Sequence, residues 1–158
     1  MPPRNYWMLV MTPENFNITR NSGFKVQGAT SSQRKKTLRF EPGDRLLFYL
    51  SEVRKFSATA TMTSKYFEDH THIWTSPRSE EDFPHRAQIK LDVVLNEEDY
   101  IDARIIAPRM EYVRRWPPEA WPLAFTGNLH LIPRNDFTLI EGEMRRIVRV
   151  NGTGNKSR

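Results

Sequence analysis

The chain has 158 residues, a hydrophobic content of 38% and a net charge of +5 at neutral pH. This length suits one domain with a packed core, and the lack of cysteine excludes disulfides and thiolate metal sites and fits a reducing compartment. The first apolar run is too short for a signal peptide or a membrane span, so we expect a soluble, cytoplasmic protein with no membrane partner.

The first part of the chain reads as a strand, a helix and a second strand. Residues 6–11 are apolar throughout and rich in strand-favouring types, which predicts a fully buried strand. Thr12 is expected to be the N-cap of a helix whose first residue is Pro13. Turn-forming residues at 21–23 end that helix, and residues 24–28 then form a short strand.

The middle of the chain is expected to be mostly β-structure. A strong turn signal precedes a buried strand over residues 45–50. The small side chains of residues 56–62 indicate a strand in a crowded barrel interior. Residues 64–85 read as a long loop with aromatics and prolines, and residues 86–94 alternate as a strand does.

The last part of the chain contains the clearest helix. Residues 100–106 fit a strand end or a helical turn, and the prolines of residues 116–122 exclude a long helix there. Asn135 or Asp136 is expected to cap the final helix, whose apolar residues recur at spacings of three and four. We predict a flexible N-terminus over residues 1–4, one α+β domain with a strongly curved sheet or barrel over residues 5–150, and a disordered tail over residues 151–158.

Signals of catalysis are weak. His70 and His72 would share one face of a strand, as in some metal sites, but no third ligand has a fixed place, although Asp69 and His85 lie near in sequence. Acidic runs elsewhere read as solvated surface. We therefore expect no catalytic residues, no metal and no cofactor.

Signals of binding are stronger. The run Arg34, Lys35 and Lys36 lies between two predicted strands, where a projecting loop can contact phosphates. Trp74 lies in the long polar loop. It is expected either to fasten that loop to the core or to act as a stacking platform for a base.

Several segments in a fixed order carry a family resemblance over about residues 5–147. They are the opening of the first strand at residues 5–7, residues 24–28, residues 34–38, the turn and strand at residues 42–50, and the helix that follows residue 133. In this order and spacing the chain resembles the EVE-domain family, a branch of the PUA-like superfamily that is related to the YTH readers of N6-methyladenine. The resemblance implies a PUA-like curved β-barrel with flanking helices and a pocket for a flipped base.

The resemblance also implies site residues. Asn15 resembles the asparagine that YTH readers place after the first strand, and Trp74 resembles one cage tryptophan. Gln27 stands where the second cage tryptophan is expected, and it offers hydrogen bonds to a base edge in place of stacking. Gly28 would let the backbone approach the base, and the end of the first strand would line the same cavity. The predicted pocket consists of Met11, Thr12, Asn15, Gln27, Gly28 and Trp74, with phosphate contacts from Arg34, Lys35 and Lys36.

The leading hypothesis is a non-enzymatic reader of DNA or RNA that takes a flipped, modified base, for example 5-methylcytosine. Whether it acts alone or with a partner nuclease or modification enzyme stays open. Two alternatives stay open. One is a small-molecule sensor or protein-interaction module. The other is a metal-dependent nucleotide hydrolase that uses His70 and His72.

Overall fold

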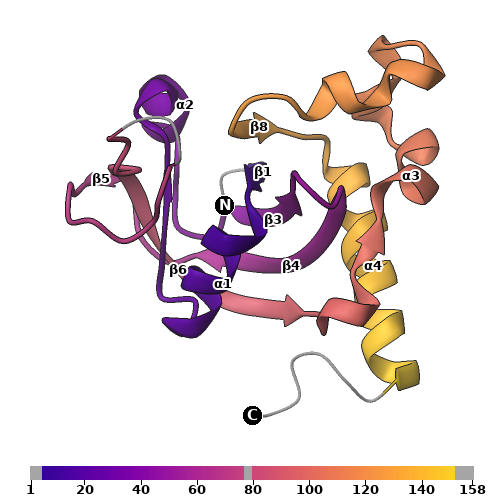
Figure 1. Cartoon of the computed structure of the whole chain (residues 1–158), viewed down its shortest axis with the longest axis horizontal. Coiled ribbons are helices and arrows are strands. Elements are labelled where there is room, and N and C mark those ends of the chain that lie inside the picture. Colours follow the sequence, from indigo (N-terminus) through magenta and orange to yellow (C-terminus); the bar gives the residue numbers. More distant parts are fainter. Residues whose placement is uncertain (1–4, 77–79, 152–158) are drawn as a thin grey trace.

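A computed structural model describes residues 5–76 and 80–151 of the chain. In this part a curled mixed sheet forms a half-barrel with flanking helices (Figure 1). The strands are β1 (Tyr6–Met11), β2 (Val26–Ala29), β3 (Arg45–Leu50), β4 (Lys55–Met62), β5 (Phe67–Glu68), β6 (His85–Val94), β7 (Ile101–Asp102) and β8 (Leu129–Leu131). The α-helices are α1 (Pro13–Asn21), α2 (Arg34–Thr37), α3 (Ala103–Ile106) and α4 (Arg134–Asn151). Short 3-10 turns are η1 (Ser31–Gln33), η2 (Glu97–Asp99), η3 (Ala107–Arg109), η4 (Glu111–Arg115) and η5 (Pro118–Phe125).

The sheet contains both parallel and antiparallel strand pairs. The main path is β2-β6-β4-β3-β1-β8, with β5 paired to β6 and β7 paired to β4. β1 runs parallel to β3, whereas the other paired strands are antiparallel. The predicted α+β class, with a curved barrel-like sheet and flanking helices, is confirmed. The expected N-terminus at 1–4 and residues 152–158 of the expected tail lie outside the described residues, whereas Asn151, expected to open that tail, is the last residue of α4.

β1 is apolar throughout because both of its faces are covered. Met8 and Val10 pack in a cluster that includes Phe137 of α4. Leu9 points to the other face, into a cluster that includes Phe16 of α1. Successive side chains of a strand alternate between faces, so a strand with two buried faces needs a continuous apolar run.

The predicted helix start in the N-terminal part of the chain is confirmed, and the strand that follows this helix begins later than predicted. Thr12 caps α1, since its Oγ1 accepts a hydrogen bond from the backbone N of Asn15 at 3.1 Å, and Pro13 is the first helical residue. The following strand begins at Val26, two residues later than predicted. Phe24 has a left-handed φ of 55°, which an extended strand does not allow.

Further along the chain, the small residues of β4 lie in a crowded interior as predicted: Ala58 and Ala60 are fully buried. The long loop is largely irregular and contains only β5 among its described residues. For the segment predicted as a strand end or a helical turn, both structures occur, first the strand β7 and then the helix α3. Around residue 120 the chain forms η5 and no long helix, as the prolines predict.

The predicted start of the last helix was wrong. α4 begins at Arg134, so neither Asn135 nor Asp136 precedes it. The carboxylate of Asp136 instead accepts hydrogen bonds from the backbone N atoms of Glu111 and Tyr112, each at 2.8 Å. Asp136 therefore ties η4 to α4. No helix in the described ranges is long and apolar enough to cross a membrane.

Candidate functional site

A cleft of about 450 Å³ opens where β1 ends and α1 begins. Its walls come from four separate segments: the β1–α1 junction, the start of the β3–β4 turn, the loop that precedes β6, and the chain between η5 and β8. The lining residues are Val10, Met11, Thr12, Asn15, Ser51, Thr75, Ser76, Phe83, Phe125, Thr126, Gly127 and Asn128.

The lining combines apolar groups with neutral polar groups. Val10, Met11, Phe83 and Phe125 supply apolar surface, and the other residues supply hydroxyl, amide and backbone groups. None of these lining residues carries a charge. Such a surface suits a neutral molecule with apolar faces and polar edges, whereas a phosphate or a carboxylate would find no counter-ion there.

Asn15 fixes one wall of this cleft. Its side-chain Nδ2 donates to the carbonyl of Thr75 at 2.8 Å, and its Oδ1 accepts from the backbone N of Thr75 at 3.0 Å. The side chain is buried. Both ends of the amide are thus occupied by the backbone of Thr75, so Asn15 holds that segment against the N-terminus of α1.

Trp74 is packed in the protein interior and is not among the residues that line the cleft. Only 1% of its surface is exposed, and its Nε1 donates to Oγ1 of Thr19 at 2.8 Å. Thr19 in turn donates to Oε1 of Gln27 at 2.7 Å, and Gln27 Nε2 donates to the carbonyl of Gly28 at 2.9 Å. The predicted pocket residues Trp74 and Gln27 therefore belong to one internal hydrogen-bond chain.

Gly28 is required by close packing. A Cβ at this position would lie 2.3 Å from the carbonyl oxygen of Phe83 and 2.9 Å from Cζ3 of Trp74. Side chains essentially never come so close to a backbone atom, so only glycine fits without a shift of the loop. Gln27 and Gly28 line a small enclosed cavity of about 10 Å³ inside the barrel, apart from the cleft.

Arg86 anchors the loop between β5 and β6. Its guanidinium donates to the carbonyls of Thr71, Asp82 and Phe83, and it lies over the ring of Trp74 with 5.1 Å between Cζ and the ring centroid. Arg86 is 1% exposed. Desolvation by burial is the largest influence on the pKa of Arg86 and lowers it. One buried cation from β6 therefore shapes the segment that supplies a wall of the cleft.

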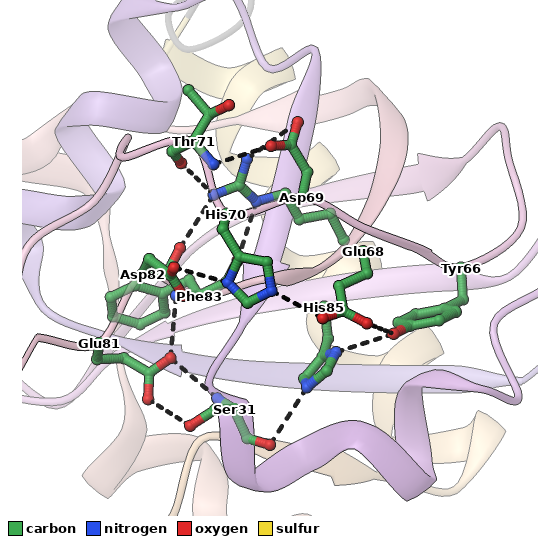
Figure 2. A network of polar contacts seen from close by, with 11 residues as sticks. Ser31, Tyr66, Glu68, Asp69, His70, Thr71, Glu81, Asp82, Phe83 and His85 are labelled. Carbon is green, nitrogen blue, oxygen red and sulfur yellow. Dashed lines mark hydrogen bonds and ion pairs between the residues drawn. The ribbon is translucent and has the colours of Figure 1, made fainter.

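Figure 2 shows further contacts that hold this loop. His70 lies between two carboxylates, with Nε2 at 2.7 Å from Glu68 and Nδ1 at 2.8 Å from Asp82. Both ring nitrogens can donate only when the imidazole is protonated, and the hydrogen bond to Glu68, followed by the one to Asp82, raises the pKa of His70. The carboxylate of Glu81 accepts from the backbone N and the hydroxyl of Ser31, both at 2.9 Å.

Phe83 is the aromatic residue of this loop that lines the cleft. Its φ of 53° lies in the left-handed region, which is costly for a residue with a side chain. The conformation is held at both of its backbone groups: the N donates to Glu81 at 3.0 Å, and the carbonyl accepts from Nε of Arg86 at 3.0 Å. Its ring meets that of Trp74 edge-on with 6.0 Å between centroids.

The predicted phosphate-binding run is helical. Arg34, Lys35 and Lys36 form most of α2 and are exposed, and none of them is among the cleft residues. The Nζ of Lys36 donates to the carbonyl of Leu129 at 2.7 Å. Because Leu129 directly follows Asn128 of the cleft lining, the basic helix lies next to one wall of the cleft.

The structure therefore brings only part of the predicted pocket together. Met11, Thr12 and Asn15 line the cleft, while Gln27, Gly28 and Trp74 lie behind it. Sequence reasoning missed the cleft residues Val10, Ser51, Thr75, Ser76, Phe83, Phe125, Thr126, Gly127 and Asn128. The available signal was weak: Phe83 and Phe125 are aromatic residues in segments without strand or α-helix patterns.

The histidine pair does not form a metal site in the described ranges. His70 binds two carboxylates on opposite edges of its ring, and no group of three or more His, Cys, Asp or Glu residues is placed to hold a metal ion. The geometry gives no support to the alternative of a metal-dependent hydrolase.

Comparison with known proteins gives one family and one fold. A family model described as the EVE domain matches residues 5–112. The fold is similar to the Mmi1 YTH domain in a complex with RNA, with a TM-score of 0.67, 8% identity and coverage of 98% of this chain and 85% of that chain. Among curated proteins, none matches this chain in sequence.

Two further solved structures are similar. The YTH domain of the Zygosaccharomyces rouxii MRB1 protein, in complex with N6-methyladenosine RNA, has a TM-score of 0.65 and 17% identity, with coverage of 92% of this chain and 94% of that chain. Human THYN1, in complex with 5-methylcytosine-containing DNA, has a TM-score of 0.59 and 13% identity, with coverage of 89% of this chain and 97% of that chain. At these identities the likeness establishes the fold.

Proposed function

Because this chain belongs to the EVE domain family, we propose that it is a non-enzymatic reader domain that holds one flipped, modified base of DNA or RNA in the cleft beside α1. The observation that carries this proposal is the cleft itself, with its volume of about 450 Å³ and its uncharged lining. A nucleobase is neutral and flat, with apolar faces and polar edges, so it matches such a surface.

The similar structures support a nucleic-acid ligand. They are complexes with RNA, with N6-methyladenosine RNA and with 5-methylcytosine DNA. Two of these ligands carry a methylated base. A base that has left its stack loses a few kcal/mol of stacking and pairing, and a protein pocket must return that free energy.

We assign the stacking contact to Phe83. Phe83 lines the cleft with 9% of its surface exposed, whereas Trp74, at 1%, does not line the cleft. Stacking of a base on an aromatic ring returns about 1–3 kcal/mol, which offsets most of the cost of extrusion. Trp74 then supports the ring of Phe83 through their edge-on contact, and Asn15 keeps the Thr75 wall in place.

The flanking phosphates would contact α2. Arg34 and Lys35 are exposed on this helix, and Lys36 ties the helix to the strand that follows the cleft. Lysine and arginine contacts to phosphates release counter-ions, so they add affinity that falls with salt but carries no base specificity. The net charge of +5 agrees with this division of roles.

The lack of titratable side chains among the cleft residues supports binding without chemistry. General acid–base catalysis needs a carboxylate, imidazole or similar group within hydrogen-bond reach of the reacting atoms. The hydroxyls and amides of this lining can orient a base but do not ionise near neutral pH.

The test is binding of short fluorescent DNA and RNA strands with one central unmodified base, 5-methylcytosine, 5-hydroxymethylcytosine or N6-methyladenine, at two salt concentrations. We expect one modified strand to bind at least tenfold more tightly than its unmodified counterpart. Phe83→Leu, which keeps an apolar side chain but removes the ring, should abolish most of that preference. Ile105→Ala, at a residue that is 75% exposed on α3, is the control.

Equal and feeble binding to every strand would overturn the proposal and favour the sensor or protein-interaction alternative. Retention of the full preference in a folded Phe83→Leu variant would move the stacking contact to another residue. Thermal unfolding of each variant separates these results from loss of the fold.

A further inference from the structure

The cleft offers more space than one base fills. Pockets of roughly 300–1,000 Å³ hold ligands of drug size, so a cleft of about 450 Å³ has room for more than a pyrimidine ring, which with its exocyclic atoms has about eight heavy atoms. A methyl group adds only one more. A ligand that fills the cleft therefore extends well beyond a methylated pyrimidine.

The lining is rich in hydroxyl groups. Thr12, Ser51, Thr75, Ser76 and Thr126 each contribute one. Thr12 Oγ1 accepts from the backbone of Asn15, which leaves its O–H free to donate, while the Thr126 hydroxyl donates to the carbonyl of Leu123 at 3.0 Å and keeps acceptor capacity. The cleft thus presents both donors and acceptors on rotatable groups.

The amides of the lining are already occupied. Asn15 binds the backbone of Thr75 through both amide atoms. Asn128 donates to the carbonyl of Val10 and accepts from the backbone N of Thr30, each at 2.9 Å. The hydroxyls of Ser51, Thr75 and Thr126 also donate within the protein, to the carbonyl of Met11 at 3.4 Å, to Oδ1 of Asn15 at 3.5 Å and to the carbonyl of Leu123 at 3.0 Å. Their lone pairs remain as acceptors, and the natural donors to them are hydroxyl groups of the ligand.

We propose that the base read by this cleft carries a bulky, neutral, hydroxylated substituent, such as a sugar joined to a 5-hydroxymethylpyrimidine. This inference rests on the proposed reader function and names the class of base. No described residue of the lining carries a charge, which disfavours substituents with a phosphate, a carboxylate or an amine, because a charge without a partner is costly to bury. Extra hydroxyl contacts would also add discrimination, since they form only with a base that carries the substituent.

The experiment compares DNA strands of one sequence that carry 5-methylcytosine, 5-hydroxymethylcytosine or glucosylated 5-hydroxymethylcytosine. The free glucosylated nucleoside is also tested as a competitor against the best-bound RNA strand. We expect the glucosylated strand to bind at least tenfold more tightly than the methylated strand, or the nucleoside to displace the RNA. The double variant Ser51→Ala, Thr126→Val alters two exposed cleft residues and should reduce this ratio to about one, while Ile105→Ala leaves it unchanged.

Two failures are distinguishable. If the methylated strand binds as tightly as the glucosylated one and the nucleoside does not compete, the bulky hydroxylated substituent is excluded and the reader function stands. If no modified strand of DNA or RNA binds better than its unmodified counterpart, the reader function fails and the inference fails with it.

Discussion

The guanidinium of Arg86 lies over the indole ring of Trp74, with 5.1 Å between Cζ and the ring centroid, and both side chains are 1% exposed. The same guanidinium donates to three carbonyls of the loop that precedes β6. One residue thus contacts both the ring of the tryptophan and the backbone of the loop. The following predictions test this loop and its neighbours.

Arg86→Met should destabilise the fold by about 3 kcal/mol. The substitution leaves the carbonyls of Thr71, Asp82 and Phe83 without a donor in a buried setting, where each unpaired group costs about 1–3 kcal/mol. Urea denaturation gives the free energy of unfolding. Lys90→Met, at an exposed position of the same strand, is the control and should change it by less than about 0.5 kcal/mol. Equal effects of the two variants would contradict an anchoring role for Arg86.

Gly28→Ala should destabilise the protein by about 1–3 kcal/mol, because the new methyl group meets the carbonyl of Phe83 and the ring of Trp74. Gly142→Ala is the matched control. Nothing lies within 4 Å of a Cβ at that position of α4, so alanine should stabilise the helix by about 0.5–1 kcal/mol. Opposite shifts of the thermal midpoint are expected, and a stabilising Gly28→Ala would show that the loop moves away easily.

Asn15→Asp should weaken both the fold and ligand binding. The change replaces the donor Nδ2 with an oxygen that faces the carbonyl of Thr75, so one hydrogen bond becomes a repulsion in a buried place. A loss of about 1–3 kcal/mol in the free energy of unfolding is expected. Asn17→Asp, on the exposed side of α1, adds the same charge without that contact. If both variants bind modified strands equally well, Asn15 does not shape the cleft.

The stability of the protein should fall as pH rises above about 6.5, in part because of His70. Its folded pKa is raised, first by Glu68 and then by Asp82, so folding favours the protonated ring. The stabilisation is complete below the unfolded value near 6.5 and is lost as pH passes through the raised folded value. His70→Gln should remove this part of the pH dependence in denaturation curves. An unchanged pH profile would show that the two carboxylates do not stabilise the imidazolium.

Lys35→Gln should reduce the dependence of nucleic-acid affinity on salt. Loss of one phosphate contact lowers the slope of log affinity against log salt by roughly 0.7–0.9 and leaves the preference between bases unchanged. Binding titrations at several salt concentrations measure the slope. Arg149→Gln, near the C-terminal end of α4 and on the other side of the molecule from α2 (Figure 1), is the control. The same slope in both variants would place the phosphate contacts away from α2.

The sequence predicts those parts of the structure that local patterns control. Thr12 and Pro13 signal a helix start by themselves, because capping and a fixed proline φ act within a few residues. The apolar run of β1 and the small residues of β4 likewise report burial directly. Asp136 was misread because its hydrogen-bond partners lie more than twenty residues earlier in the chain.

The candidate site could be predicted only in part for the same reason. Met11, Thr12 and Asn15 are contiguous with two clear elements, and they do line the cleft. The position of Trp74 depends on Arg86 and Thr19, and the place of Phe83 depends on a left-handed backbone held by Glu81 and Arg86. Such contacts join distant parts of the chain and leave no periodic pattern in the sequence.

The bonds that hold the loop between β5 and β6 also bear on the kinetics of recognition. This wall of the cleft is fixed by Arg86, by Asn15 and by the contact of Glu81 with Ser31, so its conformational entropy is already lost on folding and binding need not order it again. Strands with different bases would then meet the same rigid opening at similar rates. Discrimination between them would lie in how long each complex survives, that is, in the dissociation rate constant.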